Sequence, residues 1–333
     1  MKFDDFTAGF ADALAGIPEI HLKPVESFLH AYFEILVKKG FDLPSYQKIL
    51  STFFETVGRQ IENPYPFSPH HLALRTPVDY YTLGQEFFRP LVQFEKSTLS
   101  GRAHLHTIDR LVESGENVIL LANHQIEADP QMISLMIEKV TPRLAPNLTF
   151  VAGERVVTDP LAVPLSLGRN LFCIYSKKYF EYASKEKKAL MISHNQHVIH
   201  EIGKNLHEGG LCLYIASSGG RDRKNTHGKI PIAPFDPDSI ALMELLAKKA
   251  KKPTHLFGLA LYTYEILPPP QSLQVELGEQ RTTSEAPIHI GFSPEIDLSK
   301  VPAEGCTKEE LRSRKRDCVY EIVANIYNGF FIE

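Results

Sequence analysis

Apolar residues recur every three or four positions through the opening part of the chain, which is the spacing of helices that bury one face. One such stripe covers residues 25–36. A second covers residues 46–61, with Pro44 near its start, as helix beginnings often have. Three prolines between residues 64 and 69 then interrupt the pattern. We therefore predict a small helical bundle domain over residues 1–75.

Beyond this region the pattern changes to short apolar runs that alternate with stretches of helical spacing. The candidate strands are residues 117–122, 148–152, 170–176, 210–216, 255–262 and 287–292. The candidate helices are residues 102–114, 130–139, 188–208, 236–250 and 307–328. Such alternation predicts an α/β domain over residues 76–333, in which helices cover a mixed, mainly parallel sheet. The last two strands lie close together in the sequence, which favours an antiparallel pair.

The composition limits the class of protein. Hydrophobic residues make up 43% of the 333 residues, which is enough to build a packed core. A net charge of −4 and a pI near 6.4 argue against a nucleic-acid partner, which would favour a strongly basic domain. No apolar run approaches the ~18–20 residues of a transmembrane segment, so we expect at most peripheral membrane contact.

The cysteines and the first residues bear on the cellular compartment. Cys173 and Cys212 lie in apolar runs, which predicts buried free thiols in a reducing environment. The residues after Met1 form neither a long apolar signal core nor a Ser/Arg-rich transit segment. We therefore expect a bacterial cytoplasmic protein, and the alternative is a processed, mature protein of the plastid stroma.

The segment from Leu120 to Pro130 carries the strongest chemical signal. His124 follows an apolar strand, and Asp129 is expected to cap a helix whose first residue is Pro130. On one straight helix the side chains of His124 and Asp129 would point about 140° apart, so they can meet only across a loop. A histidine held by a carboxylate is a general base for a hydroxyl, which favours acyl transfer to an alcohol. The alternative is that Asp129 only caps the helix and His124 is an ordinary loop residue.

A second candidate site follows another predicted strand. Two glycines there permit close approach of the backbone to a ligand, and Arg221 and Arg223 then present planar guanidinium groups suited to phosphate. Lys178 lies just past a further strand, and α/β proteins bind ligands at such strand ends. These three cations predict a phosphate pocket, with a solvated basic loop as the alternative.

Two other groups of residues suggest different chemistry. Ser217 and Ser218 could supply a nucleophile with His124 as its base, but the G-x-S-x-G elbow that exposes such a serine is absent from the sequence. Three histidines at three-residue spacing over residues 194–200 could bind a metal ion. A helix face of ordinary histidines is favoured, because no carboxylate accompanies them.

Several ordered segments together resemble the soluble, plastid-type glycerol-3-phosphate 1-O-acyltransferases of the glycerolipid acyltransferase superfamily. They are N-H-Q-I-E-A-D-P at 123–130, F-V-A-G-E-R-V at 150–156, G-R-N-L at 168–171, Y-S-K-K at 175–178, S-G-G-R-D-R at 218–223 and A-P-F-D at 233–236. The likeness covers residues 69–296 and is weak before residue 65. The ordered set is specific, whereas the H-x4-D motif alone indicates only the wider superfamily.

The resemblance implies a helical N-terminal domain followed by an α/β domain that holds the active site. It implies transfer of a fatty acyl group from acyl-(acyl carrier protein), or from acyl-CoA, to the sn-1 hydroxyl of glycerol 3-phosphate. The product is 1-acyl-glycerol 3-phosphate, and no metal or cofactor is needed. His124 carries over as the general base and Asp129 as the partner that orients it. Lys178, Arg221 and Arg223 carry over as phosphate ligands.

Two positions depart from the family pattern, and one of them, Ser217 in place of the usual proline, is expected to be structural only. The residue after Lys178 is usually histidine in that family and is Tyr179 here. A tyrosine hydroxyl can donate a hydrogen bond to phosphate but carries no positive charge near pH 7. Two alternatives to the implied function stay open: an acyltransferase for another acceptor such as lysophosphatidate, and a non-catalytic acyl-carrier or lipid-binding module.

Overall fold

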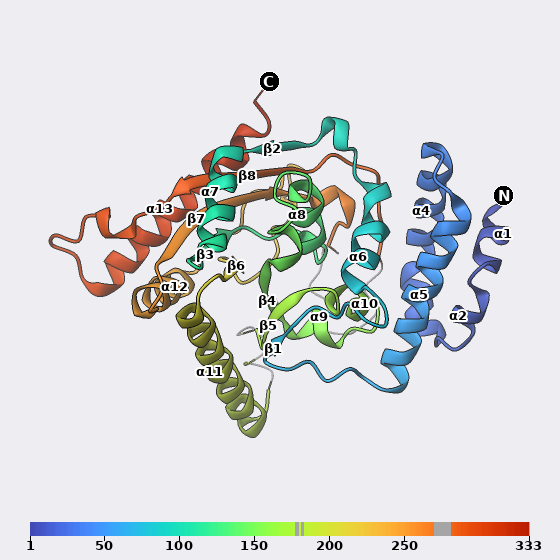
Figure 1. Ribbon diagram of the computed structural model, residues 1–333, viewed down its shortest axis with the longest axis horizontal. Helices are drawn as coiled ribbons and strands as arrows, with labels where there is room; N and C mark the ends of the chain where they lie inside the picture. Colours follow the sequence, from blue (N-terminus) through green and yellow to red (C-terminus); the bar gives the residue numbers. More distant parts are fainter. Residues whose placement is uncertain (177–179, 181–182, 270–280, 333) are drawn as a thin grey trace.

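The computed structural model describes residues 1–332 except 177–179, 181–182 and 270–280. Within these residues an eight-stranded sheet has the order β1-β5-β4-β6-β3-β7-β8-β2 (Figure 1). The strands are β1 (His70–His71), β2 (Thr98–Ser100), β3 (Asn117–Ala122), β4 (Thr149–Gly153), β5 (Asn170–Ile174), β6 (Cys212–Ala216), β7 (Thr254–Tyr262) and β8 (His289–Glu295). Five of its neighbouring pairs are parallel, and β7 and β8 run antiparallel, which confirms the predicted mixed, mainly parallel sheet.

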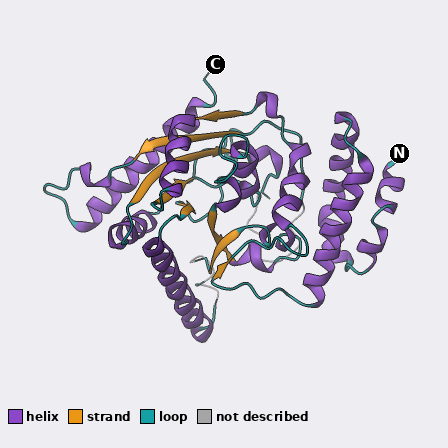
Figure 2. Ribbon diagram, in the orientation of Figure 1, coloured by secondary structure: helices purple, strands orange, loops and turns teal. Residues whose placement is uncertain are grey.

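Helices cover both faces of this sheet (Figure 2). Those after the N-terminal region are α6 (Tyr80–Phe88), α7 (Arg102–Glu113), α8 (Asp129–Ile137), α9 (Glu154–Thr158), α10 (Val163–Ser166), α11 (Lys185–Glu208), α12 (Pro237–Lys249) and α13 (Lys308–Gly329). Val118 and Leu120 of β3 belong to the apolar cluster under α7 and α8, while Ile119 and Leu121 belong to the cluster under α11, α12 and α13. Burial on both faces explains why β3 is apolar at successive positions.

The N-terminal helices stand side by side at one end of the molecule (Figure 1). They are α1 (Phe3–Ala8), α2 (Ala11–Ala15), α3 (Glu19–Leu22), α4 (Glu26–Lys39) and α5 (Leu43–Glu62). Tyr32 and Leu50 lie fully buried between them, and the same apolar core continues through Phe87 of α6 to Ile126 beyond the end of β3. The helical region is therefore present as predicted, and a domain boundary at residue 75 stays a prediction.

The structure departs from the sequence-based prediction at the edges of the sheet. β1 and β2 are absent from the predicted strands, because runs of two and three residues are too short for a period-two pattern to register. β8 ends at Glu295 rather than at residue 292, and α11 begins at Lys185 rather than at residue 188. Cys173 and Cys212 are buried free thiols as predicted, and burial raises the pKa of Cys173 to about 12.

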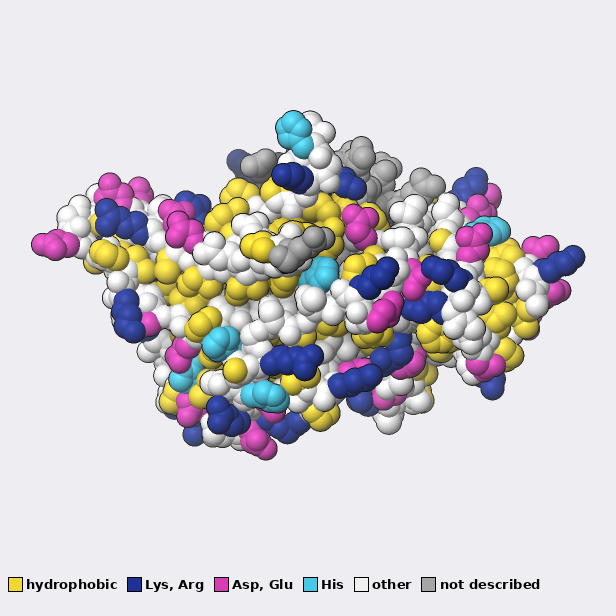
Figure 3. Space-filling model, turned by 90° about the horizontal axis from the view of Figure 1, so that it is seen from above, with side chains coloured by type: hydrophobic (Ala, Val, Ile, Leu, Met, Phe, Trp, Pro, Cys, Tyr) yellow, Lys and Arg dark blue, Asp and Glu magenta, His cyan; other side chains and the backbone are white. Residues whose placement is uncertain are grey.

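The surface is mixed in charge. Figure 3 shows acidic and basic side chains interspersed over the face it views, in keeping with a net charge of −4. Among the helices of the described residues, none combines the length and apolar character needed to cross a lipid bilayer.

His255 joins three segments at one end of the sheet. Its ring nitrogens lie 2.7 Å from Glu116, just before β3, and 2.7 Å from Glu295 at the end of β8. Partial burial acts to lower the pKa of His255, but the hydrogen bonds to Glu295 and Glu116 outweigh it and raise the pKa above its usual value. The protonated ring therefore binds both carboxylates.

We expect His255→Gln to lower stability at acidic pH more than at alkaline pH. Because the folded-state pKa of His255 is raised, the stabilisation is fully present below about pH 6.5 and is lost as pH rises through the folded pKa. Solvent screens the half-exposed Glu295, so the effect should be no more than about 1 kcal/mol. Thermal unfolding at pH 6 and pH 9 measures it, and a wild-type advantage that grows with pH contradicts the account.

Candidate active site

The loop after β3 brings His124 and Asp129 together. The ring Nδ1 of His124 lies 2.8 Å from Oδ2 of Asp129, although five residues separate them in the sequence. The Asp129 side chain is fully buried, whereas the His124 side chain keeps 26% exposure. Within the described residues, Nε2 of His124 has no hydrogen-bond partner. The arrangement leaves one ring nitrogen for a proton-bearing ligand.

Asp129 is not the helix cap that the sequence predicts. Ala128 occupies the N-cap position, and Asp129 is the first residue of α8. The Asp129 carboxylate instead faces the preceding loop, where it accepts the backbone N–H groups of Gln125 at 2.8 Å and Ile126 at 3.3 Å. Its second oxygen accepts the hydroxyl of Thr263, which follows β7. Because the loop satisfies the carboxylate, none of it is left to cap the helix.

Two buried amides fasten this loop to β7. Asn123 exchanges two hydrogen bonds with the backbone of Leu261, at 2.9 and 2.8 Å. Gln125 accepts the backbone N–H groups of Thr263 at 2.7 Å and of Tyr264 at 3.0 Å. These contacts set the height and direction of His124 relative to the end of the sheet. Sequence reasoning missed their role, and the only local signal is a pair of amides that flank a histidine.

Asp222 ties the arginine-bearing loop to the histidine-bearing loop. Its backbone N–H donates to the carbonyl of His124 at 2.7 Å, and its carboxylate accepts the side-chain amides of Asn123 at 2.7 Å and Gln125 at 3.2 Å. Burial raises the pKa of Asp222 to about 6, although its hydrogen bonds oppose that shift. Asp222 lies between Arg221 and Arg223 in sequence, so this contact brings both arginines to the neighbourhood of His124.

Two of the cations predicted to bind phosphate, Arg221 and Arg223, lie in the described part of the structure. Nη1 of Arg221 lies 3.5 Å from a carboxylate oxygen of Glu127, three residues after His124, and Arg223 is partly buried in the same loop as Arg221. Lys178 and Tyr179 fall outside the described residues, so their part in the site stays a prediction.

The geometry gives less support to a serine nucleophile and to a metal site on the regularly spaced histidines. Ser217 is fully buried, and the hydroxyl of Ser218 donates to the carbonyl of Gly220 at 2.7 Å. In the described part of the chain, neither serine forms a hydrogen bond with His124. His194, one of the regularly spaced histidines, donates to the carbonyl of Cys173 at 2.8 Å and thereby joins α11 to β5.

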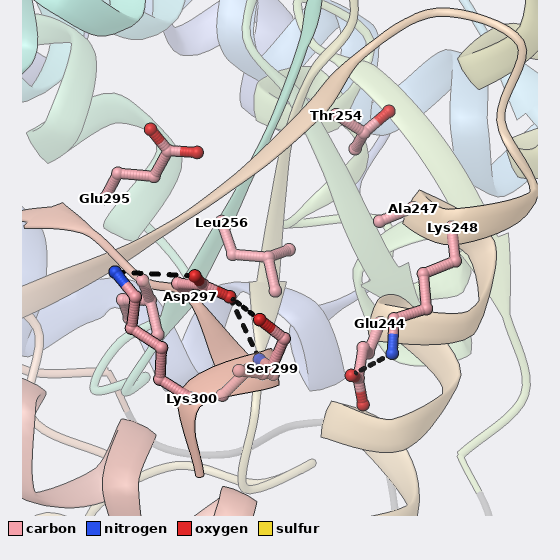
Figure 4. Close-up of a pocket in the computed structure, with 11 residues that line it drawn as sticks. Glu244, Ala247, Lys248, Thr254, Leu256, Glu295, Asp297, Ser299 and Lys300 are labelled. Carbon is pink, nitrogen blue, oxygen red and sulfur yellow. Dashed lines mark hydrogen bonds and ion pairs between the residues drawn. The ribbon is translucent and has the colours of Figure 1, made fainter.

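A cavity of about 450 Å³ lies at the opposite end of the sheet (Figure 4). Its lining includes Thr254 at the start of β7, which pairs with Asn117 at the start of β3. His124 follows the other end of β3, about 20 Å away at ~3.3 Å per strand residue. Ligands of α/β proteins bind beyond the carboxyl ends of parallel strands, which is the His124 end.

This chain matches a protein-family model and several named relatives. The Acyltransferase family model matches residues 101–259. A chloroplastic glycerol-3-phosphate acyltransferase of Cucurbita moschata is 40% identical over 80% of this chain and 60% of its own length. Those of Phaseolus vulgaris and Pisum sativum are each 35% identical over 96% of this chain and 68% of theirs. The chain belongs to the glycerol-3-phosphate acyltransferase family.

Family membership confirms the resemblance that the ordered motifs predict. The chain spans about 60% of the length of the Cucurbita moschata relatives. The matched region of the family model contains the His124 loop and the loop of Arg221 and Arg223, and it ends within β7.

We expect Asp222→Asn to destabilise this member of the family by about 1–3 kcal/mol. Both Asp222 oxygens accept hydrogen bonds, one from Ala233 and the other from Asn123 and Gln125. An asparagine would have to turn its NH₂ group toward one of these donors. Urea unfolding measures the loss. Asp42→Asn is the control, because Asp42 is an exposed helix cap and asparagine caps equally well. Equal midpoints for the two variants contradict the expectation.

Proposed function

We propose that this protein transfers a fatty acyl group from acyl-(acyl carrier protein), or from acyl-CoA, to the sn-1 hydroxyl of glycerol 3-phosphate, giving 1-acyl-glycerol 3-phosphate. The observation that carries the proposal is the hydrogen bond between His124 and Asp129 beside a loop with two arginines. The names of the relatives, which specify glycerol 3-phosphate as the substrate of an acyltransferase, support the same acceptor.

In the proposed mechanism His124 acts first as a base and then as an acid. Its Nε2 takes the proton of the sn-1 hydroxyl, and Asp129 holds Nδ1–H and stabilises the imidazolium that forms. The alkoxide oxygen attacks the thioester carbonyl carbon and gives a tetrahedral intermediate. When this collapses, the C–S bond breaks and the imidazolium protonates the leaving thiolate. The thioester is already activated, so the step needs no metal.

Arg221 and Arg223 hold the acceptor by its phosphate, with Lys178 as a third ligand. Guanidinium groups bind phosphate oxygens through paired, charge-assisted hydrogen bonds. The backbone contact from Asp222 to the carbonyl of His124 fixes the spacing between the phosphate ligands and the base. Binding the phosphate at one point therefore selects which hydroxyl reaches His124.

A small apolar cavity of about 30 Å³, which is too small to hold a long acyl chain, lies near the proposed reaction centre. It lies between the N-terminal helices and the α/β domain, and its lining includes Phe28, Phe53, Phe88, Leu161 and Leu165. Arg281 also lines this cavity and forms an ion pair with Glu127 of the His124 loop. The apolar lining therefore lies next to the loop that carries His124.

The relatives are chloroplastic by name, so they favour the plastid stroma, the alternative in the sequence-based expectation. A bacterial cytoplasm stays a prediction that nothing among the relatives supports. The choice between acyl carrier protein and CoA as the donor is likewise part of the proposal.

We expect His124→Ala to lower kcat by roughly 10²–10⁴-fold while the folded structure is kept, because a positioned general base contributes that much to a proton transfer. Initial rates with acyl-(acyl carrier protein), acyl-CoA and glycerol 3-phosphate measure it, and His106→Ala, an exposed histidine of α7, is the control. Turnover of the His124 variant near the wild-type rate would rule out the mechanism.

We expect Arg221→Ala to raise KM for glycerol 3-phosphate by roughly 10–100-fold, from a loss of about 1.5–3 kcal/mol for hydrogen bonds to a charged group. KM for the acyl donor should hardly change. Arg143→Ala removes a surface ion pair with Asp109 and serves as the control. An effect confined to the acyl donor would refute the phosphate assignment, and a preference for lysophosphatidate in the same assay would change the acceptor.

A further inference from the structure

Arg281 connects three parts of the molecule that are distant in sequence. Its guanidinium lies 2.6 Å from Asp159, between α9 and α10, and 3.1 Å from Glu127 in the His124 loop. Its backbone N–H donates to the carbonyl of Pro24 in the N-terminal helical region at 2.8 Å. The side chain is only 13% exposed, so these contacts form in a largely dry environment where charge pairing is strong.

Glu127 lies between two arginines and is held unequally by them. Its Oε2 is 3.1 Å from Arg281, whereas its Oε1 is 3.5 Å from Arg221. Charge-assisted N–H···O bonds are usually about 2.7–2.9 Å long, so Arg281 holds the carboxylate more closely than Arg221 does. Burial acts to raise the pKa of Glu127, but Arg281, Arg221 and Arg155 outweigh it and lower the pKa, which keeps the carboxylate charged at neutral pH.

A charged Glu127 this close to Arg221 competes with an incoming phosphate. Both anions are attracted to the same guanidinium group, and the Glu127 side chain is only 14% exposed, which limits its movement into bulk water. Arg281 opposes that competition because it engages the other carboxylate oxygen. Asp159 in turn fixes Arg281 from the opposite side and is itself held by the backbone N–H of Leu161 at 2.9 Å.

We propose that Arg281 is a positioning residue for the acceptor: it restrains Glu127 and so weakens the competition between this carboxylate and the phosphate of glycerol 3-phosphate at Arg221. The inference rests on the proposed function and extends it to a residue far from the motif that carries Arg221. Without Arg281, the buried Glu127 loses one of its cationic partners. Because an uncompensated buried charge is strongly unfavourable, we expect its carboxylate to move closer to Arg221. The phosphate must then break that pair before it can bind.

The test measures the dissociation constant for glycerol 3-phosphate by titration calorimetry, with no acyl donor present. We expect Arg281→Gln to raise Kd about tenfold or more, because the phosphate must then displace a charge-assisted contact between Glu127 and Arg221. Glu127→Gln removes the competing charge and should leave Kd unchanged or lower it. The double variant Arg281→Gln/Glu127→Gln should return Kd to near the wild-type value, a recovery that a merely structural loss would not produce.

The matched control is Lys315→Gln. Lys315 binds Glu244 at 2.6 and 2.8 Å, and the two side chains are 13% and 12% exposed, so this pair is as enclosed as Arg281 with Glu127. Glu244 lines the distal cavity shown in Figure 4, and the control should leave Kd unchanged.

If wild-type protein binds glycerol 3-phosphate, either of two results overturns the inference. One is an unchanged Kd in Arg281→Gln, and the other is a Kd that does not recover in the double variant. If Arg281→Gln fails to fold, a raised Kd in Glu127→Gln alone overturns it. Wild-type protein that binds no glycerol 3-phosphate overturns the proposed function as well.

Discussion

One buried carboxylate sets the geometry on which the rest of the site depends. Asp129 accepts hydrogen bonds from the ring of His124, from two backbone N–H groups of the loop and from the hydroxyl of Thr263. Donors on several sides leave the carboxylate a single orientation, and the imidazole bound to it therefore has one orientation too. Preorganisation of this kind means that no reorganisation of the pair is required when charge develops on the ring.

A second layer of polar contacts joins chain segments that the sheet alone would leave independent. The loops after β3 and β6 leave adjacent parallel strands, and the buried network of Asn123, Gln125 and Asp222 locks them to each other. Buried polar groups are costly unless every donor and acceptor is paired, so such a network specifies one arrangement of the two loops. The residues on either side of His124 thus define its surroundings as strictly as Asp129 does.

Local patterns in the sequence predict the parts of this structure that depend on neighbouring residues. The unbroken apolar run of β3 indicates a strand buried on both faces, and the five-residue step from His124 to Asp129 indicates a loop that turns back. The assignment of Asp129 as a helix cap is wrong, because a short polar side chain at a helix start serves equally well to bind the preceding turn.

Partners that lie far away in the chain leave no such pattern. Thr263 is 134 residues from the carboxylate it binds, and Arg281 is 122 residues from Asp159. Neither residue falls at a diagnostic spacing from any motif, so only the three-dimensional arrangement relates them to the site. The sequence indicates Asp222 only as part of the motif that carries Arg221 and Arg223, and its role in joining the loops follows from its burial and its contacts.

The contact between Gln125 and Tyr327 has a consequence for the order in which the chain can assemble. Tyr327, near the end of α13, accepts a hydrogen bond from Gln125 and donates one to the carbonyl of Ile230. A ribosome delivers the residues around His124 some two hundred positions before this tyrosine. The early loop therefore completes its polar network only when the last helix docks. Until then one N–H donor of Gln125 depends on water, although the other contacts of the loop amides can already form.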